Sequence, residues 1–246
     1  MSNSFLIEGL DAYINKSIDL AIKKGTDTIN ALILGEILVS KNPYLLRLEN
    51  FTLPVSEIVE ILLKESLREY NKIIFEEFAL NLAIFVCTKV YGGTKSSAEG
   101  IDLEFEKDGI RYMVSIKSGP NWGNSGQIKK MNDNFKKAKR IIGTNSSKIN
   151  ITAINGCCYG KDNKPDKGDY LKLCGQSFWE FISGDDNFFI KIIEPLSFEA
   201  KAKNDSYLQS YAQMLNKFTL EFTIDFCDDG IINWERIVRF NSETKK

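Results

Sequence analysis

Apolar residues recur with the 3.6-residue period of a helix along the first part of the chain. This pattern predicts a helix over 5–24 that ends at Gly25 and a second helix over 27–40. Asn42-Pro43 follows the second helix, and Pro54 opens a third that runs to about Arg68. The segment 71–91 is almost entirely apolar, which indicates a buried helix ended by Gly92-Gly93.

The period then changes from 3.6 to 2. Apolar and polar residues alternate over 101–106 and again over 110–117, and Asp108-Gly109 lies between the two runs. Asp-Gly between two alternating runs is the strongest short-range signal of a β-hairpin. We therefore expect two antiparallel strands joined by a two-residue turn.

A two-residue turn fixes which residues of the hairpin lie opposite each other. Glu106 should oppose Arg111 as a cross-strand charge pair, and Asp102 should oppose Ser115. The expected core face carries Ile101, Leu103, Phe105, Tyr112, Val114 and Ile116. The other face carries Asp102, Glu104, Glu106, Arg111, Met113, Ser115 and Lys117.

The remainder of the chain mixes helices and strands. We expect a helix over 125–142, a buried strand over 149–158, a polar loop over 160–169, a short strand over 171–173, a helix beginning at 177–182, a strand over 188–193 and a last helix over 205–221. The predicted fold is α/β, a mixed central sheet flanked by helices behind a helical N-terminal layer. One domain over 1–246 is expected, with that layer at 1–70, the core at 71–195 and a C-terminal helix and tail at 196–246.

Asp102 and Lys117 are diagonal neighbours in the expected hairpin. Their Cβ atoms should lie within roughly 7–8 Å of each other, so both side chains can reach one small object between them. A carboxylate and an ammonium that share a divalent cation and a phosphate form a site for phosphodiester hydrolysis. The alternating pattern alone is more typical of an ordinary charged hairpin surface, and the segment that follows Lys117 is what favours a site.

The chain contains no histidine. This absence excludes Ser-His-Asp and Cys-His catalysis, histidine-ligated zinc and histidine general bases. Carboxylates remain, and they favour hard cations such as Mg²⁺ or Mn²⁺. The five cysteines include no C-x-x-C pair, which favours reduced, mostly buried thiols.

A polar, glycine-containing loop and a basic helix follow Lys117. Seven basic residues and one acid occur between 127 and 148, although the net charge of the whole chain is −1. A local positive surface of this kind is typical of contact with a nucleic-acid backbone. The candidate DNA-binding residues are Asn121, Trp122, Asn124, Ser125, Gln127, Lys129, Lys130, Lys136 and Arg140.

The N-terminus is amphipathic with early acidic residues, unlike a signal peptide. No apolar run approaches the ~20 residues needed to cross a bilayer. We therefore expect a cytoplasmic protein without membrane association.

On these residues the chain resembles the PD-(D/E)xK nucleases, and among them the type II restriction endonucleases. The resemblance rests on Glu99-Gly-Ile-Asp102, on the hairpin and on Ser115-Ile-Lys117-Ser-Gly-Pro, with 175–185 similar to a downstream segment of some members. It covers about residues 72–195 and implies a restriction-endonuclease-like core.

The resemblance implies roles for particular residues. Asp102 would bind Mg²⁺, with Mn²⁺ as a substitute, and Lys117 would orient or deprotonate the attacking water. Ser115 replaces the family's usual acid, so the second carboxylate would come from Glu104, from Glu77 on the preceding helix or from Glu99. The Ile116 carbonyl is a further candidate ligand. The implied product is a double-strand break in DNA, made by a homodimer.

Three alternatives remain open at this stage. The first is a repair or recombination nuclease of the same fold, such as a junction resolvase. The second is a DNA-binding protein whose catalytic site has decayed, which Ser115 favours. The third is an unrelated, metal-free α/β protein with a charged hairpin.

Overall fold

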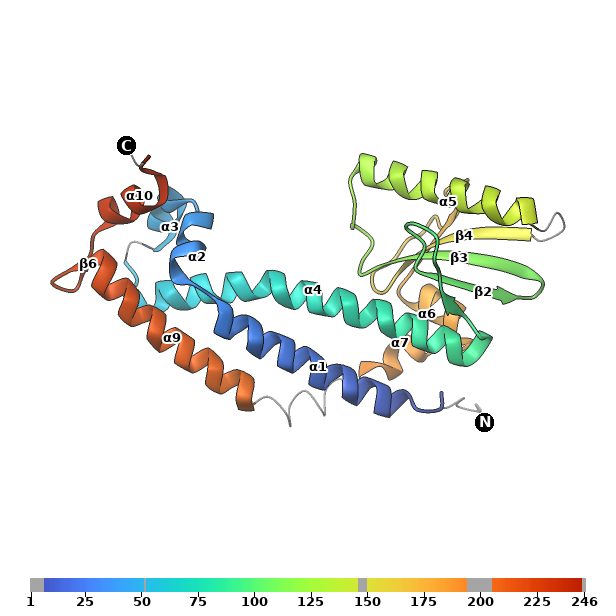
Figure 1. Ribbon diagram of the computed structural model, residues 1–246, viewed down its shortest axis with the longest axis horizontal. Coiled ribbons are helices and arrows are strands. Elements are labelled where there is room, and N and C mark those ends of the chain that lie inside the picture. Colours follow the sequence, from blue (N-terminus) through green and yellow to red (C-terminus); the bar gives the residue numbers. More distant parts are fainter. Residues whose placement is uncertain (1–6, 51, 146–149, 194–204, 245–246) are drawn as a thin grey trace. The chain divides into compact units, whose positions relative to one another are not determined.

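The computed structural model describes residues 7–50, 52–145, 150–193 and 205–244 (Figure 1). It divides into two compact units. The sheet unit comprises Met1–Ile18 and Phe75–Glu199, and the helical unit comprises Asp19–Ile74 and Ala200–Lys246. The segments expected as an N-terminal layer and as a C-terminal tail thus contribute mainly to the same unit.

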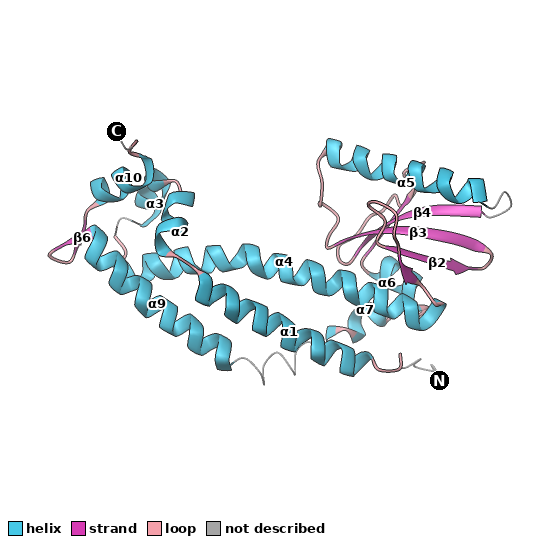
Figure 2. Ribbon diagram, in the orientation of Figure 1, coloured by secondary structure: helices cyan, strands magenta, loops and turns pink. Residues whose placement is uncertain are grey.

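The sheet unit is built on five strands, β1(Thr94–Lys95), β2(Leu103–Lys107), β3(Ile110–Lys117), β4(Asn150–Cys157) and β5(Leu171–Cys174), which lie in that order in the sheet. Figure 2 shows the neighbouring strands β2, β3 and β4. The first three are antiparallel, whereas β4 and β5 are parallel to β3. Helix α5(Ser125–Asn145) makes the crossover from β3 to β4. This mixed sheet flanked by helices confirms the expected fold class.

The predicted hairpin register is confirmed. Lys107 lies opposite Ile110, Glu106 opposite Arg111 and Glu104 opposite Met113. Asp108 and Gly109 both have positive φ, at 53° and 74°, which is the geometry of a type I′ turn. The strand β1 was not predicted, because two residues are too few to show alternation.

Both faces of the sheet are covered, including the face opposite the expected core face. Met113 is fully buried and packs with Ala153 against Met131 and Phe135 of α5. On the opposite face, Phe105 contacts rings from the flanking helices α4(Val55–Tyr91) and α6(Gln176–Ser183). Because β3 is the central strand, the pattern of one hairpin could not reveal the second layer.

Ile101 was expected beside Leu103, and this placement was wrong. Ile101 packs instead with Met113 in the core under α5. It precedes β2, in a turn whose Ile101 N–H donates to the Ala98 carbonyl at 3.1 Å. Strand alternation therefore does not extend back to this residue.

Two helices are longer than expected, because each continues through a position where the sequence predicted its end. No glycine or proline separates 54–68 from 71–91, and the two segments form the single 37-residue helix α4. Likewise, α1(Leu10–Ala31) continues through Gly25. A Cβ at Gly25 would lie 3.1 Å from the Tyr207 ring, so this glycine serves close packing rather than termination.

The helical unit contains α2(Leu34–Ser40), α3(Pro43–Asn50), α9(Asp205–Phe226) and α10(Trp234–Ser242), together with parts of α1 and α4. The second helix ends before Asn42-Pro43, as expected, since α2 ends at Ser40. Pro43 also begins α3, where proline is favoured, and the Asn42 side chain accepts from the Tyr44 and Leu45 N–H groups. A small hairpin of β6(Cys227–Asp228) and β7(Ile231–Ile232) precedes α10. Neither α10 nor this hairpin was predicted.

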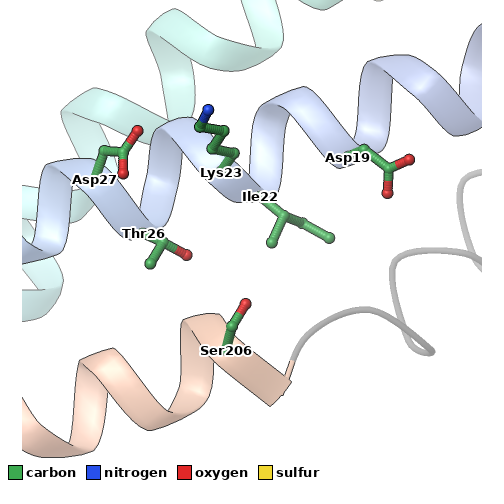
Figure 3. A pocket seen from close by; sticks show the side chains of 6 residues that line it. All are labelled: Asp19, Ile22, Lys23, Thr26, Asp27 and Ser206. Atoms are coloured by element: carbon green, nitrogen blue, oxygen red, sulfur yellow. The ribbon is translucent and has the colours of Figure 1, made fainter.

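A surface hollow of the helical unit lies between α1 and the start of α9 (Figure 3). It is lined by Asp19, Ile22, Lys23, Thr26, Asp27 and Ser206. The main core of the unit lies elsewhere, around Leu62, Leu63, Phe218 and Phe222.

The segment 188–193, expected as a strand, contains the short helix α7(Phe188–Lys191). Phe188 is buried while Ile190 is exposed. The Asn187 carbonyl accepts from the N–H groups of Ile190 and Lys191, so the local hydrogen bonds are helical. The strands predicted over 149–158 and 171–173 are confirmed as β4 and β5, and the helix predicted from 177–182 is confirmed as α6.

Candidate active site

Strand β3 presents Ser115 and Lys117 on one face of the sheet near its C-terminal end. Ser115 is 1% exposed and lies beside Asn155 of β4, whereas Lys117 is half-buried beside Cys157. The parallel pairing of β3 with β4 fixes both positions.

Asp102 lies directly before β2 and is tied to β3 at two points. Its N–H donates to the Val114 carbonyl at 2.8 Å, and its Oδ2 accepts from the Ile116 N–H at 2.6 Å. Burial raises the pKa of this carboxyl, while the Ile116 N–H, the charges of Lys117 and Lys95 and the Ser115 side chain lower it in part. The structure therefore brings Asp102, Ser115 and Lys117 together, as the register predicted.

The backbone of Ile116 contributes to the same place. The N–H and C=O groups of a strand residue point to the same edge of the strand. Because the Ile116 N–H is bonded to Asp102, the Ile116 carbonyl also faces the β2 side of β3. A carboxylate and a peptide carbonyl are hard oxygen donors.

Glu104, a candidate metal ligand, is held in other contacts. One carboxylate oxygen forms an ion pair with Arg111 at 2.7 Å, and the other accepts from the Ser96 hydroxyl. Arg111 thus bonds its diagonal neighbour Glu104 rather than Glu106, which lies directly opposite and is exposed. Diagonal neighbours lie within reach of a long side chain.

Helix α4 carries adjacent glutamates, and the structure distinguishes them. Oε1 of Glu76 accepts from the Ser118 hydroxyl at 3.1 Å, one residue beyond Lys117. Glu77, the residue named from the sequence, is exposed on the same helix. Periodicity in a continuous apolar segment did not reveal which glutamate reaches the end of β3.

Three side chains that connect β3 to the following loop form a contiguous set. Nζ of Lys117 lies 5.0 Å from the centroid of the Trp122 ring. The Trp122 Nε1–H donates to Oδ1 of Asn155 at 3.1 Å, and Nδ2 of Asn155 donates to the Ser115 carbonyl at 3.3 Å. Sequence reasoning missed Asn155, although an amide within an apolar strand was a visible signal.

Two of the predicted DNA-binding residues cap the N-terminus of α5. The Gln127 N–H donates to Oδ1 of Asn124 at 3.1 Å, and the Asn124 N–H donates to Oε1 of Gln127 at 2.9 Å. This reciprocal pair is a capping box, which stabilises the helix terminus. Asn121 and Ser125 are exposed beside it.

The basic surface of α5 is partly neutralised by acids. Lys130 and Lys137 lie 4.0 and 3.4 Å from Glu99, and Lys136 lies 3.1 Å from Asp169. In the part of the chain that the structure describes, Lys129 and Arg140 form no ion pair. Both are exposed, so they remain the stronger candidates for phosphate contact.

The buried cysteine thiols are poorly suited to nucleophilic catalysis. All five cysteines are free thiols, four of them buried, and burial raises the pKa of both Cys87 and Cys158 to about 12. Thiols of this kind are poor nucleophiles.

No helix within the described residues has the length and apolarity to cross a membrane.

The carboxylate of Asp102, the Lys117 side chain and the Ile116 carbonyl thus lie at the C-terminal end of the central strand of a mixed sheet flanked by helices, an arrangement typical of nucleases of the restriction-endonuclease class. The family model of the type II restriction endonuclease EcoO109I matches residues 8–204 of the chain, and the chain belongs to this family. It is therefore an endonuclease of the PD-(D/E)xK superfamily, and its substrate is DNA. No curated protein matches the sequence.

Proposed function

We propose that this protein hydrolyses both strands of duplex DNA at a specific short sequence in a Mg²⁺-dependent reaction. The observation that carries the proposal is the convergence of Asp102, the Ile116 backbone and Lys117 at the end of β3. Membership of the restriction-endonuclease family favours a sequence-specific cutter over a resolvase-like nuclease.

The donor set suits Mg²⁺, with Mn²⁺ as a substitute. The described residues include no group of three acidic or cysteine side chains that could hold a metal. Asp102 and the Ile116 carbonyl would therefore hold the ion together with water and substrate phosphate, an arrangement that Mg²⁺ accepts. Glu104 would join only by releasing Arg111 and Ser96. The bound ion would polarise the phosphate and lower the pKa of a coordinated water.

Lys117 holds the attacking water against the phosphorus atom. Attack forms the new P–O bond as the bond from phosphorus to the 3′ oxygen breaks, and the products are a 5′-phosphate and a 3′-hydroxyl. The attacking water gives its proton to solvent, since the Lys117 ammonium is already protonated, and the departing oxygen takes a proton from a second water. Ser115 is nearly fully buried, so its hydroxyl contacts Asp102 rather than the substrate.

We further propose that the protein acts as a homodimer. Each chain provides one set of Asp102 and Lys117, and a duplex has two strands to be cut. A symmetric dimer would place one set on each strand of a palindromic site.

Incubation of a plasmid library with the purified protein and Mg²⁺ tests the proposal. The wild type should give discrete fragments, whereas Lys117→Ala and Asp102→Ala should give none. Smears or nicks instead of fragments would contradict site-specific cutting, and cutting by Lys117→Ala at the wild-type rate would contradict the site.

A second candidate function is DNA binding without cleavage. Ser115 in place of the family's usual acid favours it, as does the engagement of Glu104 with Arg111. Persistent binding to a specific duplex with no cleavage in either Mg²⁺ or Mn²⁺ would identify that function.

A further inference from the structure

We propose that Trp122 and Asn155 are positioning residues that hold the Lys117 ammonium at its place of action. This inference rests on the proposed nuclease function and adds two residues to its machinery. Both lie on the side of β3 that carries Ser115 and Lys117.

The first link is the contact between Lys117 and Trp122. The ammonium lies 5.0 Å from the ring centroid, within the range of a cation–π attraction. A lysine side chain has four flexible bonds and samples many rotamers when it is unsupported. A fixed aromatic surface below the ammonium restricts that sampling to the neighbourhood of Asp102.

The second link fixes the ring itself. Asn155 lies on β4 beside Ser115 and is 1% exposed. Its amide oxygen accepts from the Trp122 indole N–H, and its amide nitrogen donates to the Ser115 carbonyl. A buried amide is costly unless it is hydrogen-bonded, and both ends of this one are satisfied. The indole is thereby anchored to the strand that bears the catalytic lysine.

The loop that carries Trp122 is held from a further direction. Nζ of Lys172 on β5 donates to the Pro120 carbonyl at 2.9 Å. The backbone two residues before Trp122 is thus tied to the sheet as well. A rigid support of this kind is what a catalytic group needs, because a displacement of about 1 Å can reduce a rate by about 100-fold.

These contacts favour support of Lys117 over readout of bases by Trp122. The indole N–H is used by Asn155, and one ring face is used by the ammonium. Trp122 is also half-buried, which limits the surface it can offer to DNA.

The test uses the full-length protein in single-turnover cleavage with Mg²⁺, beside DNA binding in Ca²⁺. Trp122→Leu removes the ring, while Trp122→Phe keeps a ring but removes the N–H. Loss of positioning should lower the cleavage rate of Trp122→Leu by about 30-fold or more, with a smaller loss for Trp122→Phe. The DNA affinity of both variants should stay within about threefold of wild type.

Trp179→Phe is the matched control. Trp179 lies on α6, and its indole N–H donates to the Cys158 carbonyl at 2.8 Å, so this variant also removes one indole hydrogen bond. Its cleavage rate should equal that of the wild type. Asn155→Leu should slow cleavage, and in the Trp122→Leu background it should cause little further loss because the two residues act in series. Wild-type cleavage by Trp122→Leu, or a loss of affinity as large as the loss of rate, would overturn the proposal.

A readout without cleavage separates this proposal from the proposed function. The chain has three tryptophans, so Trp122→Phe identifies the Trp122 indole N–H resonance by its disappearance. That resonance should shift in Lys117→Met and should lose protection from hydrogen exchange in Asn155→Leu. If the wild type cuts no DNA but both responses occur, the nuclease assignment fails and the support of Lys117 stands. If neither occurs, the support is refuted whether or not DNA is cut.

Discussion

The Ile116 N–H donates to Oδ2 of Asp102 across a distance of 2.6 Å. This bond fixes the carboxylate against the strand that carries Lys117, although Asp102 itself precedes β2. Burial raises the pKa of this carboxyl, and the bond from the Ile116 N–H lowers it in part.

Asp102→Asn should abolish cleavage without destabilising the fold. The amide oxygen can still accept from the Ile116 N–H, while the cost of burying a charge disappears. We expect at least about a 100-fold loss of cleavage rate, because the metal-binding charge is gone. The melting temperature at neutral pH should equal or exceed that of the wild type in a calorimetric scan. A clearly lower melting temperature would show that the carboxylate stabilises the fold.

The raised pKa of Asp102 predicts a pH dependence with a definite sign. A carboxyl with a raised folded-state pKa favours the protonated form in the native protein. Its contribution to the free energy of unfolding is fully present below pH 3.8, the ordinary pKa of the group, and is lost as the pH rises through the raised pKa. Urea unfolding at several pH values should show the advantage of Asp102→Asn over wild type growing across that window.

The same shift governs metal binding, because a proton and a cation compete for the carboxylate. The Mg²⁺ concentration required for half-maximal cleavage should rise as the pH falls, beginning above the range of an ordinary aspartate. Titration of cleavage with Mg²⁺ at a series of pH values measures it. A Mg²⁺ concentration for half-maximal cleavage that does not change with pH would show that Asp102 is not a metal ligand.

Glu104→Gln distinguishes an ion pair from a metal ligand. The carboxylate is bonded to Arg111 and Ser96, so we expect a loss of about 1–3 kcal/mol of unfolding free energy. The Mg²⁺ requirement for cleavage should change by less than about threefold, since a true ligand would cost about 10-fold or more. Arg111→Gln should cause a similar loss of stability, and the double variant should lose little more than either single variant. A Mg²⁺ requirement that rises steeply in Glu104→Gln alone would restore this residue to the metal site.

Lys172→Met should destabilise the loops beside the site. Its ammonium donates to the Pro120 carbonyl and lies 3.6 Å from Asp162, in a contact where both side chains are largely buried. Leaving these acceptors unpaired should cost about 1–3 kcal/mol of unfolding free energy in urea titration. Lys167→Met is the matched control, because Lys167 pairs with Asp162 but not with Pro120. Its loss should be smaller, and equal losses would show that the Pro120 bond contributes nothing.

The sequence alone determined the hairpin, its register and the grouping of Asp102, Ser115 and Lys117. Those features depend on local rules, namely period-2 alternation and the geometry of an Asp-Gly turn. The alternation could not show that α5 covers the second face of β3 or that Gly25 lies inside a helix, because both depend on segments distant in sequence.

Only the tertiary structure decided which polar groups complete the site. Asn155 lies beside Ser115 because β4 pairs in parallel with β3, 40 residues further along the chain. Glu76 reaches Ser118 because the packing of α4 turns this residue toward the end of β3. Glu104 is bonded to Arg111 because the two are diagonal neighbours within reach of a long side chain. Alternation in a sequence assigns a side chain to a face of its own strand, whereas its partner depends on how separate elements pack.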